Sequence, residues 1–305
     1  MVRLALIGCG IWGEKILQSL LDLEQEIVVV EPSPDRRVEI TERFQVECLE
    51  HIEGLPKVDG IIVSTPASTH VEVVQQLLPL QLPVFIEKPL TTDLAGAHAL
   101  ASASGAQLSV MHVWHYHPGV CELRRIARDR ILGPVTQLRT TRKNWTSPRT
   151  DVDSVWTLVP HDLSIAQSIL GHIPKPRFAC VERLNNRATG MLAVLGDDRL
   201  QVVIDTSNRY RDKRREIRLH GQSGVAVLEA DGDDRIFIDR EKPGSTGVST
   251  NGEYIRFSPE AALTTELLAF VRFLEGGPPP PTTVQQGVEV VEAIVALRRL
   301  AGLED

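Results

Sequence analysis

Short apolar runs alternate with amphipathic stretches along the first 118 residues of the chain. The apolar runs read RLALIG, EIVVVE, GIIVST, PVFIEK and AQLSVMH, at residues 3–8, 26–31, 60–65, 83–88 and 106–112. Alternation of strand and helix is typical of βαβ units, in which helices cover a parallel sheet. The pattern therefore predicts a doubly wound α/β domain over residues 1–118, an architecture that suits nucleotide binding.

After one more helix at residues 121–131, the pattern changes to strands separated by turn signals, among them Gly221 and Gly224, which mark antiparallel connections. Strands are expected at 135–145, 177–184, 189–196, 199–207, 215–221, 224–230 and 235–239, and helices near 155–170, 260–275 and 284–301. The proline-rich segment 275–283 is expected to be a non-helical connector. A second, α+β domain is thus predicted over residues 119–305, with the last helix either staying there or packing back on the first domain.

Composition agrees with a two-domain globular protein. The chain has 305 residues, 42% of them hydrophobic and 24% charged, and domains usually hold about 100 to 200 residues. Its formal net charge of −7 weighs against nucleic acid or an anionic membrane as the main partner. The four cysteines form no C-x-x-C pair, which indicates reduced thiols. With no signal-peptide pattern and no run of roughly 20 apolar residues, the expected location is the cytoplasm.

The segment ALIGCGIWG places three glycines in G-x-G-x-x-G spacing between a predicted strand and a predicted helix. The first glycine allows a tight turn, the second lets the backbone approach a pyrophosphate, and the third lets helix and strand pack closely. The helix N-terminus then offers amide donors to the phosphates. The cofactor-binding residues predicted from this segment are Gly8, Gly10, Ile11, Trp12 and Gly13.

An acidic residue follows the next strand at the distance that this motif requires. Glu31 is expected to accept hydrogen bonds from the adenosine ribose and to repel a 2′-phosphate, which favours NAD over NADP. Arg36 and Arg37 keep NADP open, because an arginine beside the ribose can accommodate the phosphate. Both arginines can equally be exposed on the following helix.

Two loops, STPASTH at 64–70 and EKPL at 87–90, follow the carboxyl ends of predicted parallel strands. Ligands of open α/β sheets bind beyond those ends. We therefore expect Lys88 near the nicotinamide, where it can hydrogen-bond a substrate hydroxyl or stabilise an alkoxide, although an exposed lysine at a strand end is the simpler alternative. A cis peptide bond between Lys88 and Pro89 is a further hypothesis. The cofactor contacts predicted from the two loops are Ser64, Thr65, Pro66, His70, Glu87 and Lys88.

The chain resembles the glucose-fructose oxidoreductase / inositol dehydrogenase (Gfo/Idh/MocA) superfamily of NAD(P)-dependent sugar oxidoreductases. The resemblance runs through GCGIWG, STPASTH, IEKPL, MHVWHYHPGV, VWTLVPHDLSI and TELLAFVRFLEGGPPPPTTVQQGVEVVEAI. HVWHYHP and VWTLVPHDLSI are most similar to the branch of nucleotide-sugar dehydrogenases. The resemblance implies a Rossmann domain, a C-terminal α+β domain with an open, largely antiparallel mixed sheet, and a homo-oligomer formed through that sheet. It also implies hydride transfer between NAD(P) and a ring carbon of a sugar or nucleotide sugar.

Carried over position by position, Lys88 matches the family's active-site lysine, and His161 matches the histidine that exchanges a proton with the substrate hydroxyl. The family usually has an aspartate four residues before that histidine, where this chain has Thr157. Helical spacing puts Thr157, His161, Ser164 and Ser168 on one face, so this polar stripe is directed at a cleft or a buried network. Threonine brings no charge to raise the basicity of the histidine, but activity is expected to persist because histidine titrates near neutrality.

Several carboxylates and basic residues near this helix have two interpretations. Asp162 lies about 100° around the helix from the histidine, which favours a salt bridge or a capping role. Asp151 and Asp153 are candidates to replace the missing carboxylate. The basic segment 208–218 is interpreted as a solvated hairpin in preference to a diphosphate site.

The substrate side is expected to include residues from the domain crossing and from the segment before the helix. Arginine suits an anionic sugar because its planar group binds diphosphate or carboxylate through two hydrogen bonds. No metal site is expected, since the histidines at 112–117 have no evident fourth ligand. The predicted substrate-binding residues are His115, Tyr116, Arg142, Asn144, Thr157 and His161.

Two other functions stay open at this point. A cofactor-binding regulator without turnover is compatible with the exchange at Thr157, whereas retention of Lys88 and His161 favours an enzyme. A reductase of a non-sugar ring, such as a tetrapyrrole or a cyclic diol, keeps the chemistry and changes the substrate.

Overall fold

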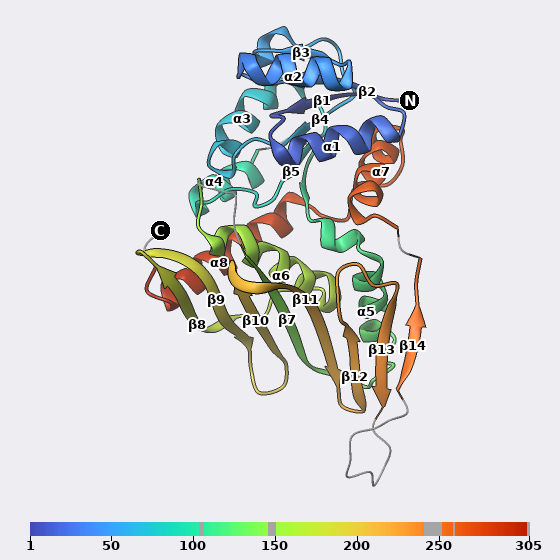
Figure 1. The fold of residues 1–305 in the computed structure, drawn as a ribbon, viewed down its shortest axis with the longest axis vertical. Helices are drawn as coiled ribbons and strands as arrows, with labels where there is room; N and C mark the ends of the chain where they lie inside the picture. Colours follow the sequence, from blue (N-terminus) through green and yellow to red (C-terminus); the bar gives the residue numbers. More distant parts are fainter. Residues whose placement is uncertain (104–106, 146–150, 241–251, 259, 304–305) are drawn as a thin grey trace. The chain divides into compact units, whose positions relative to one another are not determined.

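Apolar, β-branched runs form the core strands of the chain, and the helices between them bury one face each (Figure 1). The structure is a computed structural model, and it describes residues 1–103, 107–145, 151–240, 252–258 and 260–303. The described chain divides into two compact units, residues 1–113 with 261–291 and residues 114–260 with 292–305. The first crossing between the units, at 113/114, lies five residues before the domain boundary that the sequence indicated at 118/119.

The first unit contains a six-stranded parallel sheet in the order β3-β2-β1-β4-β5-β6. Its strands are β1 (Arg3–Ile7), β2 (Glu26–Val30), β3 (Glu47–Leu49), β4 (Gly60–Val63), β5 (Val84–Glu87) and β6 (Leu108–Met111). Five of them were predicted; β3 was missed because three residues give too short a signal. The strand order reverses between β1 and β4, which is where ligands bind in such sheets.

By the right-handed rule for such crossovers, the connecting helices on the two sides of the reversal are expected on opposite faces of the sheet. They are α1 (Ile11–Asp22), α2 (Pro34–Phe44), α3 (His70–Leu77) and α4 (Leu94–Ala101), with short 3-10 turns η1 (Ile52–Gly54), η2 (Ala67–Thr69), η3 (Leu78–Leu80) and η4 (Val113–Tyr116). Ser33 caps α2 and Asp93 caps α4 through side-chain hydrogen bonds to helix amides. The predicted doubly wound α/β fold is confirmed.

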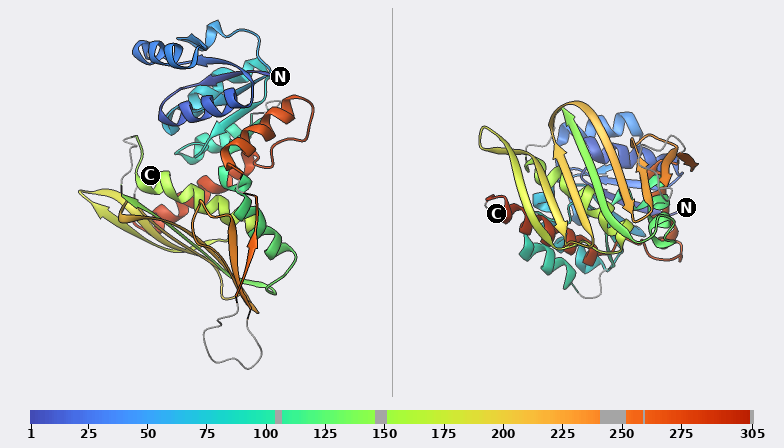
Figure 2. Two further views of the ribbon diagram at one scale, coloured as in Figure 1. Left: turned by 45° about the vertical axis from the view of Figure 1, so that its right-hand side comes forward. Right: turned by 90° about the horizontal axis from the view of Figure 1, so that it is seen from below.

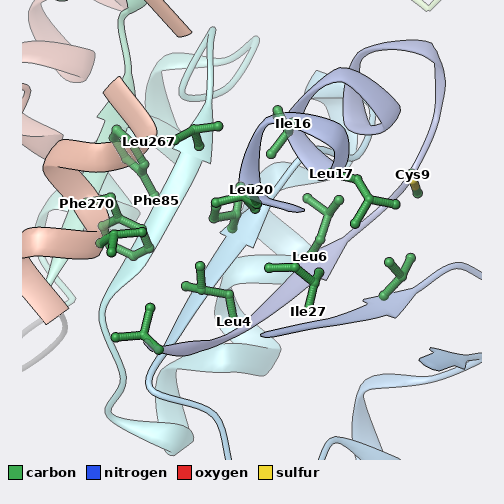
Figure 3. Packing of buried hydrophobic residues seen from close by; sticks show 14 of the residues in the cluster. Leu4, Leu6, Cys9, Ile16, Leu17, Leu20, Ile27, Phe85, Leu267 and Phe270 are labelled. Atoms are coloured by element: carbon green, nitrogen blue, oxygen red, sulfur yellow. The ribbon is translucent and has the colours of Figure 1, made fainter. Parts of the chain in front are cut away.

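A late segment of the chain completes the core of the first unit. Helix α7 (Ala262–Leu274) packs against α1, and Leu267 and Phe270 join the apolar cluster beneath it (Figure 3). The rings of Phe85 and Phe270 are 5.0 Å apart. The proline-rich connector is not helical, as predicted, and its end pairs with β6 where Val110 donates to the carbonyl of Thr282 at 3.0 Å. Helix α8 (Val284–Leu300) begins in the first unit and ends in the second.

The second unit is built on an eight-stranded sheet in the order β14-β13-β12-β11-β7-β10-β9-β8. Its strands are β7 (Val135–Trp145), β8 (Pro176–Leu184), β9 (Arg187–Gly196), β10 (Gln201–Ser207), β11 (Arg209–Gly221), β12 (Gly224–Leu228), β13 (Arg235–Arg240) and β14 (Glu253–Arg256). The pair β7–β10 is parallel and the other pairs are antiparallel. The prediction of an α+β unit with a largely antiparallel mixed sheet is confirmed.

One face of this sheet is covered by α5 (Pro118–Arg128) and α6 (Ser154–Leu170), and Figure 2 (right) shows the sheet from the other face. The strand predicted at residues 215–221 is confirmed, but it begins earlier, at Arg209, so residues 209–218 lie on the long strand β11 and do not form a hairpin. β11 pairs with β7 with a register shift between Arg209 and Arg214. The first part of the strand was missed because its charged side chains are mostly exposed and show no apolar alternation. Within the described residues, no helix is long and apolar enough to cross a membrane.

Candidate active site

Three glycines form the turn that joins β1 to α1. Gly8 has a φ of 84°, a left-handed conformation that favours glycine, and its N–H donates to the carbonyl of Val30 at 2.8 Å. A Cβ on Gly8 would lie 2.8 Å from the methyl carbon of Thr65, and a Cβ on Gly13 would lie 2.7 Å from the carbonyl oxygen of Gly8. A Cβ on Gly10 would meet no atom within 4 Å. The first and third glycines thus permit close packing, and the second leaves open space beside the backbone.

That open space lies at the N-terminus of α1. Gly10 is the N-cap residue, and no side chain in the described part of the chain caps this helix. The amides of Ile11, Trp12 and Gly13 have no acceptor inside an α-helix, and the helix dipole adds partial positive charge there. The arrangement fits the pyrophosphate of a dinucleotide. When bound, NAD(P) supplies the group that accepts or donates a hydride.

Glu31 lies directly after β2, beside the glycine turn. Its Oε2 accepts from the amide of Cys9 at 3.0 Å, and its Oε1 accepts from the amide of Ser33 at 3.1 Å. The carboxylate is half-buried. Two backbone donors therefore fix its orientation at the position where the motif places the adenosine ribose.

Both arginines after Glu31 are matched by protein acceptors. Arg36 donates through Nη2 to Glu14 at 2.5 Å and through Nη1 to Glu39 at 2.6 Å. The hydrogen bond to Glu14 raises the pKa of the Arg36 guanidinium. Arg37 donates to the backbone carbonyl of Glu31 at 2.8 Å. Neither is more than half exposed, so the alternative of two solvated arginines is wrong.

The predicted contacts after β4 and β5 lie at the same edge of the sheet as the glycine turn. The amide of Ser64 donates to the carbonyl of Ile7 at 2.8 Å. Trp12 donates through Nε1 to Oε1 of Glu87 at 2.5 Å, and Glu87 is 4% exposed. The carboxyl ends of strands β1, β4 and β5 thus bring together residues that are far apart in the sequence.

Lys88 follows β5 and is only 9% exposed, which contradicts the simpler alternative of an exposed lysine at a strand end. The peptide bond between Lys88 and Pro89 is cis, as predicted. His70 is buried too, and its ring nitrogens lie 3.0 Å from the carbonyl oxygens of Thr65 and Pro89. The first unit therefore buries both Lys88 and His70, and the histidine ring contacts the backbone of Thr65 and that of Pro89, the residue after the lysine.

In the second unit, Asp153 fixes the start of α6. Its Oδ1 accepts from the amides of Val155 at 3.0 Å and Trp156 at 3.2 Å, and its Oδ2 pairs with Arg298 at 2.6 Å. A cap followed by an apolar run explains why the helix begins here. Asp153 is therefore occupied as a helix cap and ion-pair partner. We place no substrate role on it.

The stripe of polar residues on α6 divides its hydrogen bonds between the helix backbone and other elements. Thr157 donates to the carbonyl of Asp153 at 2.9 Å, and Ser164 donates to the carbonyl of His161 at 2.8 Å. The side chain of Ser168 accepts from Arg124 of α5 at 3.5 Å. His161 and Thr157 are half-buried. A hydroxyl bound to its own helix does not supply the charge of a carboxylate.

Arg142 and Asp162 form a buried ion pair between β7 and α6. The Nε of Arg142 lies 2.8 Å from Oδ2 of Asp162, and the two side chains are 6% and 1% exposed. The guanidinium lies 4.6 Å from the ring centroid of Trp114, which stacks on His117. The salt-bridge interpretation of Asp162 is confirmed. A substrate role for Arg142 stays a prediction, although its charge is already balanced.

The other predicted substrate residues of the second unit are also mostly enclosed. His115 is 5% exposed, and burial lowers the pKa of its imidazole to about 4. Tyr116 is 8% exposed, and Asn144 is half-buried. Among the residues that the structure describes, no group of three His, Cys, Asp or Glu side chains could hold a metal. A neutral histidine here can position a hydroxyl but cannot neutralise an anion.

One buried acidic residue escaped the sequence analysis. Glu266 of α7 is 0% exposed, and among the described residues neither of its oxygens has a hydrogen-bond partner. Burial raises its pKa well above the usual range, and the charge of Glu87 adds to the shift. The signal was a glutamate inside the apolar run TTELLAFV.

Comparisons with known proteins agree with this fold. Residues 2–115 match the "Oxidoreductase family, NAD-binding Rossmann fold", known as GFO_IDH_MocA. A UDP-N-acetylglucosamine 3-dehydrogenase of Acidithiobacillus ferrooxidans is 26% identical over 198 residues, 63% of this chain and 59% of that enzyme. An inositol 2-dehydrogenase of Rhizobium meliloti is 24% identical over 282 residues, 84% of this chain and 81% of that enzyme.

Solved structures show the same fold over almost the whole chain. The structure of the Acidithiobacillus ferrooxidans UDP-N-acetylglucosamine 3-dehydrogenase superposes with a TM-score of 0.84 at 21% identity, covering 98% of this chain and 97% of that one. A 3-ketoreductase from Actinomadura kijaniata, in complex with TDP-benzene and NADP, gives 0.85 at 19% identity, covering 97% and 96%.

The fold and the glycine turn define an oxidoreductase with an NAD(P)-binding Rossmann unit. Residues 2–115 match the GFO_IDH_MocA oxidoreductase family, in agreement with the resemblance found in the sequence.

Proposed function

We propose that this protein transfers a hydride between NAD(P) and a hydroxyl-bearing or keto carbon of a sugar ring, with nucleotide sugars as the first substrates to test. One observation carries the proposal: the glycine turn, Glu31 and the buried Lys88 all follow the carboxyl ends of parallel strands of one sheet. The names of the relatives support the substrate class, since they include a nucleotide-sugar dehydrogenase and an inositol dehydrogenase.

The roles of the two proposed catalytic residues follow from their chemistry. The ammonium of Lys88 donates a hydrogen bond to the reacting oxygen and so stabilises the negative charge that develops there. The imidazole of His161 takes the hydroxyl proton during oxidation and returns it during reduction. Burial of Lys88 excludes water from its ammonium, which strengthens that electrostatic contribution.

The decisive assay follows NADH absorbance in purified protein with NAD⁺ and a panel of free hexoses, inositols and UDP- or TDP-linked sugars. Turnover is expected with at least one of them. Lys88→Ala and His161→Ala should each lower kcat by about 10² to 10⁴-fold, whereas Lys57→Ala and His172→Ala, at exposed positions, are controls that should leave it unchanged. The double variant should lose far less than the product of the two single losses if both residues act on one substrate.

We further propose a preference for NAD⁺ over NADP⁺. Two amides orient the carboxylate of Glu31. Glu14 and Glu39 offset the charge of Arg36, and Glu50 offsets that of Arg37. A 2′-phosphate would therefore meet the repulsion of Glu31, while the two nearby arginines already have acidic partners. The dissociation constant should be at least about tenfold lower for NAD⁺, a difference of roughly 1.4 kcal/mol. Glu31→Ser should narrow the ratio, and equal binding of both cofactors by the parent protein would contradict the assignment.

A regulator that binds cofactor without turnover is the second candidate. The observation that favours it is Thr157, whose hydroxyl donates to its own helix where the family usually has a carboxylate. Clear NAD⁺ binding with no turnover on the whole panel would support this candidate. Thr157→Asp separates the two: an enzyme with a weakened site should gain rate, and an unchanged or lower rate counts against the proposed role of this position.

Assembly and location complete the proposal. The uncovered face of the eight-stranded sheet exposes Phe178 by 53% and Leu192 by 44%, and apolar residues on an open sheet favour pairing with a second copy. We propose a homo-oligomer formed through this face, to be tested by sedimentation with Phe178→Lys. The four free thiols suit a reducing compartment, so we place the protein in the cytoplasm.

A further inference from the structure

His70 lies between the two loops that carry the proposed cofactor and lysine positions. It is the first residue of α3 and is 1% exposed. Its Nε2 lies 3.0 Å from the carbonyl oxygen of Thr65, in the loop after β4. Its Nδ1 lies 3.0 Å from the carbonyl oxygen of Pro89 and 3.3 Å from that of Leu90, in the loop after β5.

Both ring nitrogens therefore face acceptors that have no proton to give. A neutral imidazole carries one N–H, and its other nitrogen presents a lone pair. At 3.0 Å that lone pair would repel a carbonyl oxygen, and the distance leaves no room for a water between them. Only the doubly protonated ring donates to both loops at once, and hydrogen bonds from a charged donor are stronger than neutral ones.

The surrounding elements supply few other charges. Of the elements that pack on α3, the segments β4, η2 and η3 carry no titratable side chain. Helix α4 contributes exposed His98 and its N-cap Asp93, and α3 itself contributes exposed Glu72. The end of β5 contributes Glu87 and Lys88. The carboxylates would favour a charged ring, whereas Lys88 and the burial of the ring oppose it. The imidazolium therefore depends on the two carbonyl contacts.

We propose that His70 is a positioning residue, held as an imidazolium in the folded protein, which clamps the loop after β4 to the loop after β5 and thereby sets the place of Lys88. The inference rests on the proposed function for its catalytic consequence. The protonation state itself does not depend on that function. Pro89 follows Lys88 directly, so a displaced Pro89 carbonyl moves the lysine backbone with it.

The first test reads the protonation state in the whole chain without cofactor or substrate. Protein containing ¹⁵N-labelled histidine is examined by long-range ¹H–¹⁵N correlation between pH 6 and 9.5. One histidine should keep both ring nitrogens protonated at pH 8, and its signal should be missing from His70→Gln. His51→Gln, at a side chain 69% exposed, is the matched control and should retain it.

The result that overturns the proposal needs no variant. If the parent spectrum at pH 8 contains only neutral histidines, each with one unprotonated nitrogen, the imidazolium does not exist. If a doubly protonated histidine is present and persists in His70→Gln, it belongs to another residue, and the proposal is equally overturned. His70→Asn serves the same purpose should the glutamine variant fail to fold.

The second test asks whether the clamp acts through Lys88. In the parent protein kcat should fall on the alkaline side at the pH where the ¹⁵N signals of His70 titrate, because one of the two loop contacts is then lost. His70→Gln should lower kcat about tenfold or more with KM nearly unchanged, and its profile should lack that alkaline step. An unchanged kcat profile in the variant would refute the positioning role. A protein with no turnover on any substrate would instead refute the proposed function and leave the NMR result standing.

Discussion

Replacement of Glu266 by glutamine should stabilise the protein, and the gain should grow with pH. The carboxyl is fully buried in α7 and has no hydrogen-bond donor among the described residues, and desolvation followed by the charge of Glu87 raises its pKa well above the usual value. The folded protein therefore holds this proton more tightly than the unfolded chain does. Glutamine keeps the shape and the polarity and removes the titration.

The sign and size of the effect follow from proton linkage. When the pKa of a carboxyl is higher in the folded protein than in the unfolded chain, the protein loses stability as pH rises above the unfolded pKa of about 4.3. Each pH unit between the unfolded and the folded pKa costs about 1.4 kcal/mol. Near pH 4 the two proteins should differ little. At pH 7 Glu266→Gln should be more stable by as much as about 4 kcal/mol, the limit reached when the folded carboxyl is still protonated.

Urea unfolding at half-unit steps from pH 4.5 to 8 measures this difference. Every other titrating group is common to both proteins, so the free energy of unfolding of the variant minus that of the parent isolates Glu266. Glu72→Gln removes an exposed carboxylate and should shift stability by no more than about 0.5 kcal/mol. A difference that stays flat with pH, or that favours the parent at pH 7, would show that this carboxyl is ionised in the folded protein and would refute the reasoning.

Three further predictions address the turn and the second unit. Gly13→Ala brings a Cβ to within 2.7 Å of a backbone oxygen and should lower the free energy of unfolding in urea by about 1 to 3 kcal/mol. The Cβ of Gly10→Ala meets no atom within 4 Å, so this variant should keep its stability but bind NAD⁺ more weakly in a titration. Equal effects of the two substitutions on stability would contradict the turn geometry. Asp162→Ala leaves the charge of Arg142 buried without its partner and should cost about 3 to 5 kcal/mol, while the paired exchange of Arg142→Met with Asp162→Leu should recover most of it; calorimetry decides. Burial lowers the pKa of His115 to about 4, so the unfolded chain binds a proton at this imidazole more tightly than the folded protein does. The free energy of unfolding should therefore fall as pH drops below about 6.5, by roughly 3 kcal/mol at pH 4. His115→Asn should lack this part of the loss of stability in acid.

Local signals were sufficient for five of the six strands of the first unit, but not for β3 or for the late segment 261–291, which the sequence pattern placed in the second domain. Those five strands are buried on both faces and read as unbroken apolar runs, and the helices between them show caps at Ser33 and Asp93. The glycine spacing needs only the turn between one strand and one helix. Gly8, Gly10 and Gly13 could therefore be given separate roles before any coordinates, and the packing around them agrees.

The partners of charged side chains could not be predicted, because each depends on residues far away in the sequence. Nothing near Asp153 indicates Arg298, and nothing near Arg142 indicates that Asp162 lies beneath it. The basic residues of β11 resembled a hairpin because the pairing with β7 that makes them a strand is a long-range contact.

The sequence by itself therefore determined most of the helices and strands, the glycine turn and the types of residue available for chemistry, since hydrophobic period and turn geometry act over a few residues. Only the tertiary structure decided which of those residues are enclosed and what they bind. It buried Lys88, tied His70 to two loops and placed Glu266 among apolar side chains, because burial and hydrogen bonding are set by neighbours that folding brings together from distant segments.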